Sequence, residues 1–179
     1  MRRRVAVTGM GVVTPIAQTV ETFGEALRQG RSGAGPITLF DPALLPTRIA
    51  AEVRWTGPIL RDRKVTFALE AARQAMHGGR PPGVGGLSLG IGLELFSLDD
   101  LAARERPGFL PPATRAERLT FVQTPSDLCV HLIANRHDLR APPLTHVSAC
   151  AAGTDAVGTG FRLVASGRRD WVLAGARTR

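Results

Sequence analysis

The chain has 179 residues, which is one domain's worth and enough to bury a core. Hydrophobic residues make up 44% and charged residues 21%, with 20 glycines and 13 prolines, as is typical of a globular α/β protein. No apolar run approaches the roughly 18 residues of a membrane-spanning helix, and the arginine-rich start leads into a strand and turn pattern rather than a signal peptide. We therefore expect a cytoplasmic protein with no membrane segment.

The formal net charge of +8 would suit a nucleic-acid-binding protein or a partner of an acidic protein. The arginines are scattered along the chain, there is no tyrosine, and aromatic residues make up only 5%. Such a surface does not offer the stacked aromatic side chains that bind single strands. We therefore expect no nucleic-acid partner.

Residues 4–13 are rich in valine and alternate little between polar and apolar positions, which predicts a strand buried on both faces. Within them, Thr8-Gly9-Met10-Gly11 begins like a dinucleotide-binding loop. Thr14 stands where that loop needs its third glycine, so the motif fails and no nucleotide cofactor is expected.

Helical and extended patterns alternate through the rest of the chain. Residues 97–120 are a loop-rich stretch with one short helix, to which we assign no chemistry. The alternation predicts an α/β fold with a mostly parallel sheet and helices on both faces. In chain order, the predicted elements are a helix from its Thr19 cap to its Gly30 stop, a strand at 48–53, a helix at 62–76, a strand at 87–93, a helix at 127–137 capped by Ser126, a strand leading to Cys150, a helix at 151–166 and a strand at 171–174.

The segment from Thr145 to Ala156 predicts a strand, a sharp turn and a helix, with Cys150 at the turn. Unpaired N–H groups and the helix dipole at such a place stabilise an anion. The small residues around Cys150 leave room for a substrate carbonyl. Two interpretations stand equally from this chemistry alone: Cys150 is a nucleophile for acyl transfer, or it is a buried and inert cysteine.

Cys129 and His146 are the nearest candidates for a second role in thiol chemistry. Cys129 lies within a helix among leucine, valine and isoleucine, so we interpret it as a packed core thiol. His146 precedes Cys150 by four residues in a strand, which separates the two by about 13 Å, so it is not expected to be a direct base. Two cysteines form neither a disulfide framework nor a metal-ligand cluster, and no metal is expected.

The run VSACAAGTDAVG closely resembles the nucleophile motif of β-ketoacyl-acyl-carrier-protein synthases of the KAS II-like type, condensing enzymes of the thiolase-like superfamily. The opening RRRVAVTGMGVVTPIAQTVETFGEALRQGRSGAGPITLFDP and the run TPSDLCVHLIANRHDLRAPPLTHVSAC are similar to the same family. The resemblance implies a thiolase-like half-fold, with Cys150 as the catalytic residue. Members of the family are longer, so residues 1–179 are predicted to be a truncated N-terminal β-ketoacyl synthase domain without the C-terminal half.

The resemblance implies an acyltransferase of fatty acid or polyketide synthesis that needs no cofactor. In such enzymes the cysteine takes an acyl group from a carrier protein or CoA, and the carbanion from decarboxylated malonyl-carrier protein attacks the resulting thioester. The two histidines and the lysine that support these steps lie on motifs that this chain does not show. The implied partners are an acidic acyl carrier protein, acyl and malonyl thioesters, and a second subunit in a homodimer or heterodimer. Arg61, Arg63 and Lys64 are our candidates for the carrier contact.

Three hypotheses therefore remain open. The chain is a condensing-enzyme half that is active only with its second half, or a non-catalytic partner like a chain length factor, or a truncated fragment whose thiol merely carries or hydrolyses acyl groups. The presence of Cys150 argues against the second, because such partners usually lack the cysteine.

The predicted helix at 151–166 carries only two charged residues, Asp155 and Arg162, and several glycines. A helix that is apolar around its circumference is normally buried on several faces, and one sheet cannot cover all of them. We therefore expect this helix to expose an apolar face and the strand at 171–174 to be an unprotected sheet edge.

Overall fold

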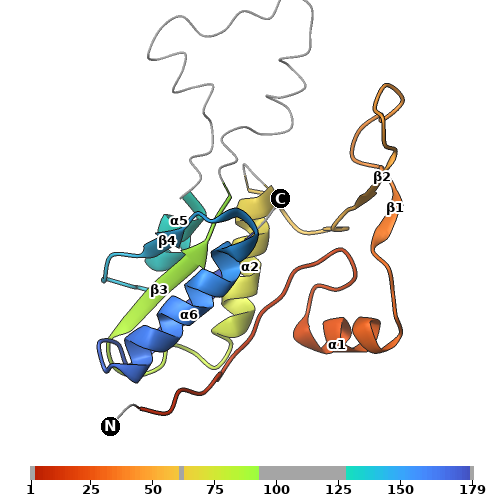
Figure 1. The fold of residues 1–179 in the computed structure, drawn as a ribbon. Coiled ribbons are helices and arrows are strands. Elements are labelled where there is room, and N and C mark those ends of the chain that lie inside the picture. The colour runs from red at the N-terminus through yellow and green to blue at the C-terminus, as the bar shows by residue number, and fades with distance from the viewer. Residues whose placement is uncertain (1–2, 61–62, 93–127, 178–179) are drawn as a thin grey trace, which may run out of the picture. The chain divides into compact units, whose positions relative to one another are not determined.

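The computed structural model describes residues 3–60, 63–92 and 128–177 (Figure 1). The chain divides into two compact units. The first comprises residues 1–6, 59–69 and 80–179, and the second comprises residues 7–58 and 70–79. Within the described ranges, no helix is long and apolar enough to cross a membrane.

The first unit is built on a parallel sheet of three strands in the order β4-β3-β5. The central strand β3 (Gly85–Gly90) is buried along its whole length. It pairs in parallel with β4 (Leu144–His146) on one side and with β5 (Trp171–Ala176) on the other. The predicted parallel sheet is confirmed, and among the described residues β5 has β3 as its sole strand neighbour, as expected of an edge.

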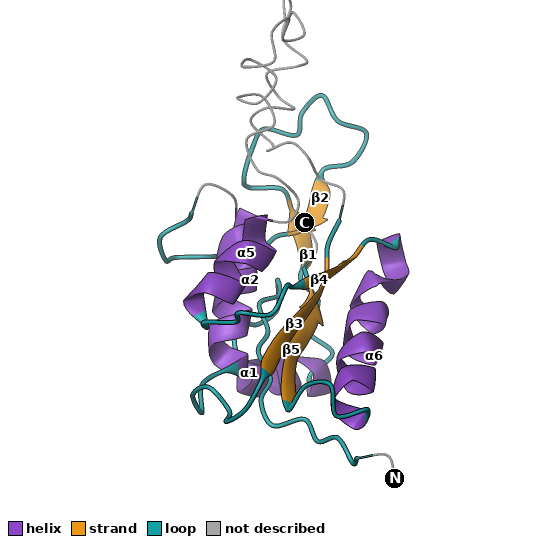
Figure 2. Ribbon diagram, turned by 90° about the vertical axis from the view of Figure 1, so that its left-hand side faces the viewer, coloured by secondary structure: helices purple, strands orange, loops and turns teal. Residues whose placement is uncertain are grey.

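Helices cover both faces of this sheet, as the alternating pattern predicts (Figure 2). The helix α6 (Ala152–Ala165) lies on one face, and α5 (Leu128–Arg136) lies on the opposite face with the first turns of α2 (Arg63–Ala75). Small residues bring α6 close to the strands: a Cβ on Gly160 would touch Val172 and Ala174 at 3.1–3.2 Å.

The outer face of α6 is open, which confirms the expectation that this helix exposes an apolar face. Ala156 and Gly160 are buried against the sheet, whereas Val157 and Phe161 are 55% and 52% exposed. One sheet face therefore buries one stripe of the helix and leaves another apolar stripe uncovered.

The second unit begins with α1 (Val20–Arg28), whose predicted cap is confirmed because the Thr19 hydroxyl accepts a hydrogen bond from the Thr22 backbone N–H. The strands β1 (Ala34–Pro36) and β2 (Ile49–Ala51) pair antiparallel. The rest of α2, residues 70–75, completes the unit. The predicted Ser126 cap and the loop at 97–120 lie outside the described residues.

The predicted strand at residues 4–13 is wrong. No strand forms there, and Val7 and Met10 are 81% and 61% exposed. A strand buried on both faces needs hydrogen-bonding neighbours and two covering layers, and the described sheet provides neither for these residues. The valines indicate that this segment favours burial. A strand forms there only if a neighbouring strand pairs with it, and the local sequence does not specify such a neighbour.

Gly9 and Gly11 have a packing role in this structure. Their Cα atoms lie against the carbonyl oxygens of Ala75 and Ala71 in α2, so that a Cβ at either glycine would overlap the helix backbone. Gln74 of the same helix strengthens this contact, since its Oε1 accepts from the Val12 backbone N–H at 3.1 Å. The two glycines thus allow a loop to lie directly on a helix.

Candidate active site

Cys150 lies in a sharp connection between a strand and a helix, as the sequence predicts. A single 3₁₀ turn (Ala149–Ala151) joins the end of β4 to the start of α6. Ala149 has φ +47°, a left-handed conformation that costs a non-glycine residue about 1–2 kcal/mol. Such strain gathers at functional sites, and nucleophile elbows of hydrolases use a similar turn.

The two cysteines have opposite environments. Cys150 is exposed, whereas Cys129 in α5 is only 1% exposed. Burial raises the pKa of the Cys129 thiol, and the Arg177 guanidinium, whose Nε donates to Cys129 Sγ at 3.3 Å, acts in the opposite direction. The interpretation as a packed core thiol is confirmed for Cys129, and burial does not hold for Cys150.

The carboxyl ends of the three parallel strands meet beside this turn. The Ile91 N–H donates to the His146 carbonyl at 2.9 Å, and the Arg177 N–H donates to the Gly90 carbonyl at 3.1 Å. A Cβ on Gly90 would lie 2.6 Å from the carbonyl carbon of Ala152, so the first residues of α6 rest directly on the end of β3. Ligand sites of open parallel sheets occur at this edge.

Polar side chains also join the two sides of the turn. The Ser148 hydroxyl donates to Asp155 Oδ2 at 2.5 Å, and Asp155 lies in the first turn of α6, where a carboxylate is favoured by the helix dipole. His146 Nε2 lies 2.9 Å from Ser88 Oγ, so this ring nitrogen is engaged by the central strand. That His146 is not a direct base for Cys150 stays a prediction.

Sequence patterns alone did not single out Ser88 or Arg177. Ser88 is 0% exposed and Arg177 is 7% exposed. Ser88 contacts His146 and Ala156, which are 58 and 68 residues away, and Arg177 donates to Cys129, which is 48 residues away. A usable signal existed for Ser88: a polar residue at the centre of a strand that is otherwise leucine and glycine needs a buried partner.

The residues proposed for the carrier contact are not supported as a group. Lys64 is only 3% exposed, so it is not available to a partner surface, and that assignment is wrong. Arg63 lies over the ring of Phe67 at 5.2 Å from its centroid. Arg61 lies outside the described residues. The start of α2 is buried on more than one face, because the consecutive residues Lys64, Val65 and Thr66 are all buried, and this is not what the charge of Lys64 suggests.

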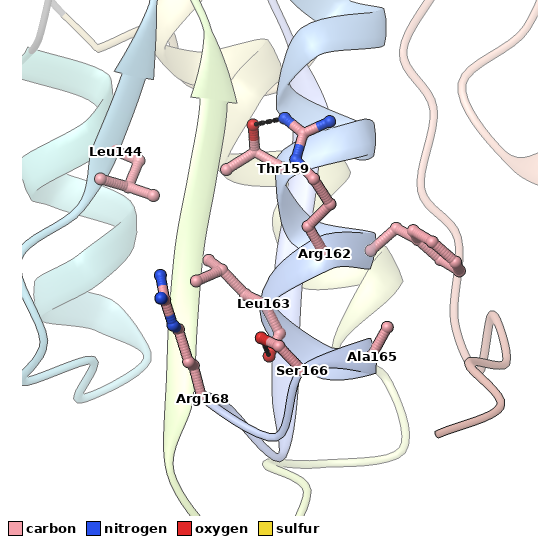
Figure 3. A pocket seen from close by; sticks show the side chains of 8 residues that line it. Leu144, Thr159, Arg162, Leu163, Ala165, Ser166 and Arg168 are labelled. Atoms are coloured by element: carbon pink, nitrogen blue, oxygen red, sulfur yellow. Dashed lines mark hydrogen bonds between the residues drawn. The ribbon is translucent and has the colours of Figure 1, made fainter. Parts of the chain in front are cut away.

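A second feature of the first unit is an apolar hollow of about 580 Å³ near the C-terminal half of α6 (Figure 3). Among the residues of α6 that line the hollow, Thr159 is the first in the sequence. It follows Cys150 by nine residues, which corresponds to about 13 Å along a helix axis. The hollow contains neither cysteine nor histidine, so it is not the candidate active site. Its lining residues are Leu144, Thr159, Phe161, Arg162, Leu163, Ala165, Ser166 and Arg168.

No group of three or more histidine, cysteine, aspartate or glutamate side chains with the arrangement of a metal site occurs within the described ranges. Cys150 thus presents a thiol on a strained strand-to-helix turn. Backbone hydrogen bonds and the Ser148 hydroxyl hold this turn in place.

The amino-acid sequence is similar to known proteins along nearly its whole length. The family model described as the N-terminal domain of β-ketoacyl synthase matches residues 2–64 and 59–178. A 3-oxoacyl-[acyl-carrier-protein] synthase 2 of Coxiella burnetii is 33% identical over 97% of this chain and 45% of its own length. The tetracenomycin polyketide synthase ketoacyl synthase alpha subunit of Streptomyces glaucescens is 32% identical, again over 97% of this chain and 45% of its own.

Solved structures resemble the chain as well. The ishigamide ketosynthase/chain length factor superposes with a TM-score of 0.69 at 28% identity, covering 98% of this chain and 47% of that protein chain. The chain thus spans about half the length of the relatives that it matches. Since the family model accounts for nearly every residue, the chain belongs to the β-ketoacyl synthase family and carries its N-terminal domain.

Proposed function

We propose that this chain supplies the nucleophile half of a β-ketoacyl-acyl-carrier-protein synthase, with Cys150 as the residue that accepts the acyl group. The observation that carries the proposal is the exposed Cys150 on a strained turn between β4 and α6. Its place in a chain that matches the family over residues 2–178 supports the same assignment.

The chemistry follows from a thiol at that position. The Cys150 thiolate attacks the carbonyl carbon of an acyl thioester, and the tetrahedral intermediate collapses with release of the carrier thiol, which takes up a proton. Loss of CO₂ from a malonyl thioester leaves a carbanion. That carbanion attacks the acyl-Cys150 carbonyl, which forms the new carbon–carbon bond and regenerates the thiolate. The Cys150 backbone N–H is our candidate for one oxyanion donor.

The condensation step needs more than the described groups provide. The single lysine of the sequence, Lys64, is buried in α2, and none of the four histidines lies on a motif that resembles the family's histidine motifs. We propose that the decarboxylation groups come from a second half, since the chain spans 45% of its relatives' length.

The open surface of α6 supports a covering second half. Val157 and Phe161 are more than half exposed on a helix whose opposite side is fully packed. Exposed apolar side chains on a central helix suit a protein interface. We propose that this face and the edge strand β5 are covered in the complete enzyme.

The same proposal includes the binding partners of the protein and its cellular compartment. An acidic acyl carrier protein would be attracted by the net charge of +8. The name of the Coxiella burnetii relative includes an acyl carrier protein, and the Streptomyces glaucescens relative is named as a subunit of a polyketide synthase. A homodimer or heterodimer is proposed for the complete enzyme. Because acyl transfer needs Cys150 as a free thiol, we place the protein in a reducing compartment, the cytoplasm.

Acylation of the chain tests the proposed function directly. The full chain is incubated with an acyl-pantetheine thioester, and peptide mass mapping locates the adduct. We expect acylation at Cys150, none at the buried Cys129, and none in Cys150→Ala. We also expect no β-ketoacyl product when malonyl thioester is added to the chain alone. An unmodified Cys150 under conditions that acylate a full-length relative would contradict the nucleophile role, and would leave a non-catalytic partner as the better hypothesis.

A further inference from the structure

The two ends of the turn that carries Cys150 are joined through one buried serine. Ser88, in the middle of β3, is 0% exposed and donates its hydroxyl hydrogen to the Ala156 carbonyl of α6 at 2.9 Å. The same oxygen lies 2.9 Å from His146 Nε2, at the end of β4. His146 is four residues before Cys150 and Ala156 is six residues after it. We name this arrangement of Ser88, His146 and Ala156 the serine clamp.

The hydrogen-bond directions in the clamp fix the state of the histidine ring. A hydroxyl has one hydrogen, and that of Ser88 is given to the Ala156 carbonyl. Towards His146 the Ser88 oxygen therefore accepts, so Nε2 carries the hydrogen and donates it. The clamp thus needs a hydrogen-bond donor at the position of Nε2. A side chain of similar size without a donor at that position would not replace His146.

The clamp acts on a turn that is strained. Ala149 is left-handed and Cys150 is exposed, so few contacts of their own side chains hold these residues in place. Strained conformations persist where the surrounding structure fixes both ends. The last residue of β4 and the second turn of α6 each form a hydrogen bond to Ser88 of β3. Figure 1 shows β3 running beside both elements.

We propose that His146 is a positioning residue for Cys150: through Ser88 it holds the turn so that the thiol stays at the start of α6. This inference rests on the proposed function, because it assigns His146 a role in presenting the nucleophile. It gives His146 no proton-transfer role. A nucleophile reacts fastest when its position is fixed relative to the incoming carbon, and a thiol on a loosened turn spends less time in that position.

Alkylation of the full chain by iodoacetamide tests the inference without any acyl substrate. Peptide mass mapping gives separate rates for Cys150 and Cys129, and the buried Cys129 reports whether the unit stays closed. His146→Gln keeps an N–H at the reach of Nε2, whereas the shorter His146→Asn does not. His77→Asn is the matched control, because His77 is exposed and lies in the other unit.

We expect His146→Asn to alkylate Cys150 about two- to five-fold more slowly than the unchanged chain, in keeping with the modest net strength of the one hydrogen bond that is lost. His146→Gln and His77→Asn should retain the original rate, and Cys129 should stay protected throughout. Ser88→Ala removes the shared acceptor from β3 and should match His146→Asn.

Two results would overturn the inference. One is a Cys150 rate in His146→Asn and Ser88→Ala that equals or exceeds the original rate while Cys129 stays protected. The other is exposure of Cys129 in both variants, which would make the clamp a support of the whole unit and not of the turn. The proposed function fails separately, when the unchanged chain takes no acyl group although the difference between His146→Gln and His146→Asn persists.

Discussion

The contact between Gly90 and the start of α6 gives the sharpest prediction. The substitution Gly90→Ala places a Cβ 2.6 Å from the Ala152 carbonyl carbon, 2.7 Å from its oxygen and 2.9 Å from the Gly153 nitrogen. All three are backbone atoms, and ordinary contacts of a Cβ begin at about 3.4 Å. The strand and the helix must therefore move apart by most of an ångström, because no flexible side chain can yield.

Such overpacking costs about 1–3 kcal/mol, which for a chain of this size lowers the melting temperature by about 2–12 °C. The matched control is Gly175→Ala in β5, where no heavy atom lies within 4 Å of the new Cβ. That variant should melt at or slightly above the original temperature, because alanine reduces the entropy of the unfolded chain.

Thermal unfolding of the full chain, followed by circular dichroism for both variants at equal concentration, measures the difference. The packing argument is refuted when Gly90→Ala melts together with Gly175→Ala. Because the displaced residues, Ala152 and Gly153, directly follow the 3₁₀ turn of Cys150, the Gly90 variant should also alkylate Cys150 more slowly than the control does.

Two further predictions follow from the described side chains. Burial, with a smaller contribution from Arg136, holds the pKa of His137 below its ordinary value of 6.5, so the unfolded chain binds the proton more readily. The contribution of His137 to the free energy of unfolding is then present above about pH 6.5 and is lost as the pH falls. Denaturant titrations across this range should show that the free energy of unfolding depends less steeply on pH in His137→Gln. An unchanged dependence would contradict the assignment. Phe161→Ser should leave the melting temperature nearly unchanged, because that ring is 52% exposed, and should reduce self-association of the chain in sedimentation experiments. Equal self-association of Phe161→Ser and the unchanged chain would show that the outer face of α6 does not mediate self-association. The comparison variant is Ala156→Ser on the buried face of α6, which should lower the melting temperature.

Much of the candidate site was predictable because it depends on local order along the chain. The run from Thr145 to Ala156 predicts a strand, a turn and a helix from residue types within twelve positions, and the structure has them in that order. Cys129 was predictable as a core thiol because its neighbours in the sequence are apolar, and Val130 and Ile133 are buried with it. Helix caps behave similarly, since Thr19 bonds a residue only three positions away.

The predictions failed where burial depends on what covers a segment. Residues 4–13 have the composition of a buried strand, but composition does not provide a neighbouring strand. Lys64 has the charge of a surface residue, but its position on α2 turns it inwards. Both outcomes are set by packing between distant parts of the chain.

The sequence by itself determined the family, the parallel α/β pattern and the place of Cys150 between a strand and a helix, because these follow from motif and periodicity. Only the tertiary structure decided that Ser88 meets His146 and Ala156, which lie 58 and 68 residues away, and that Arg177 reaches Cys129 across 48 residues. The physical reason is strand register. A shift of one residue in the pairing of β3 with β4 would turn Ser88 to the other face of the sheet, and no local pattern specifies that pairing.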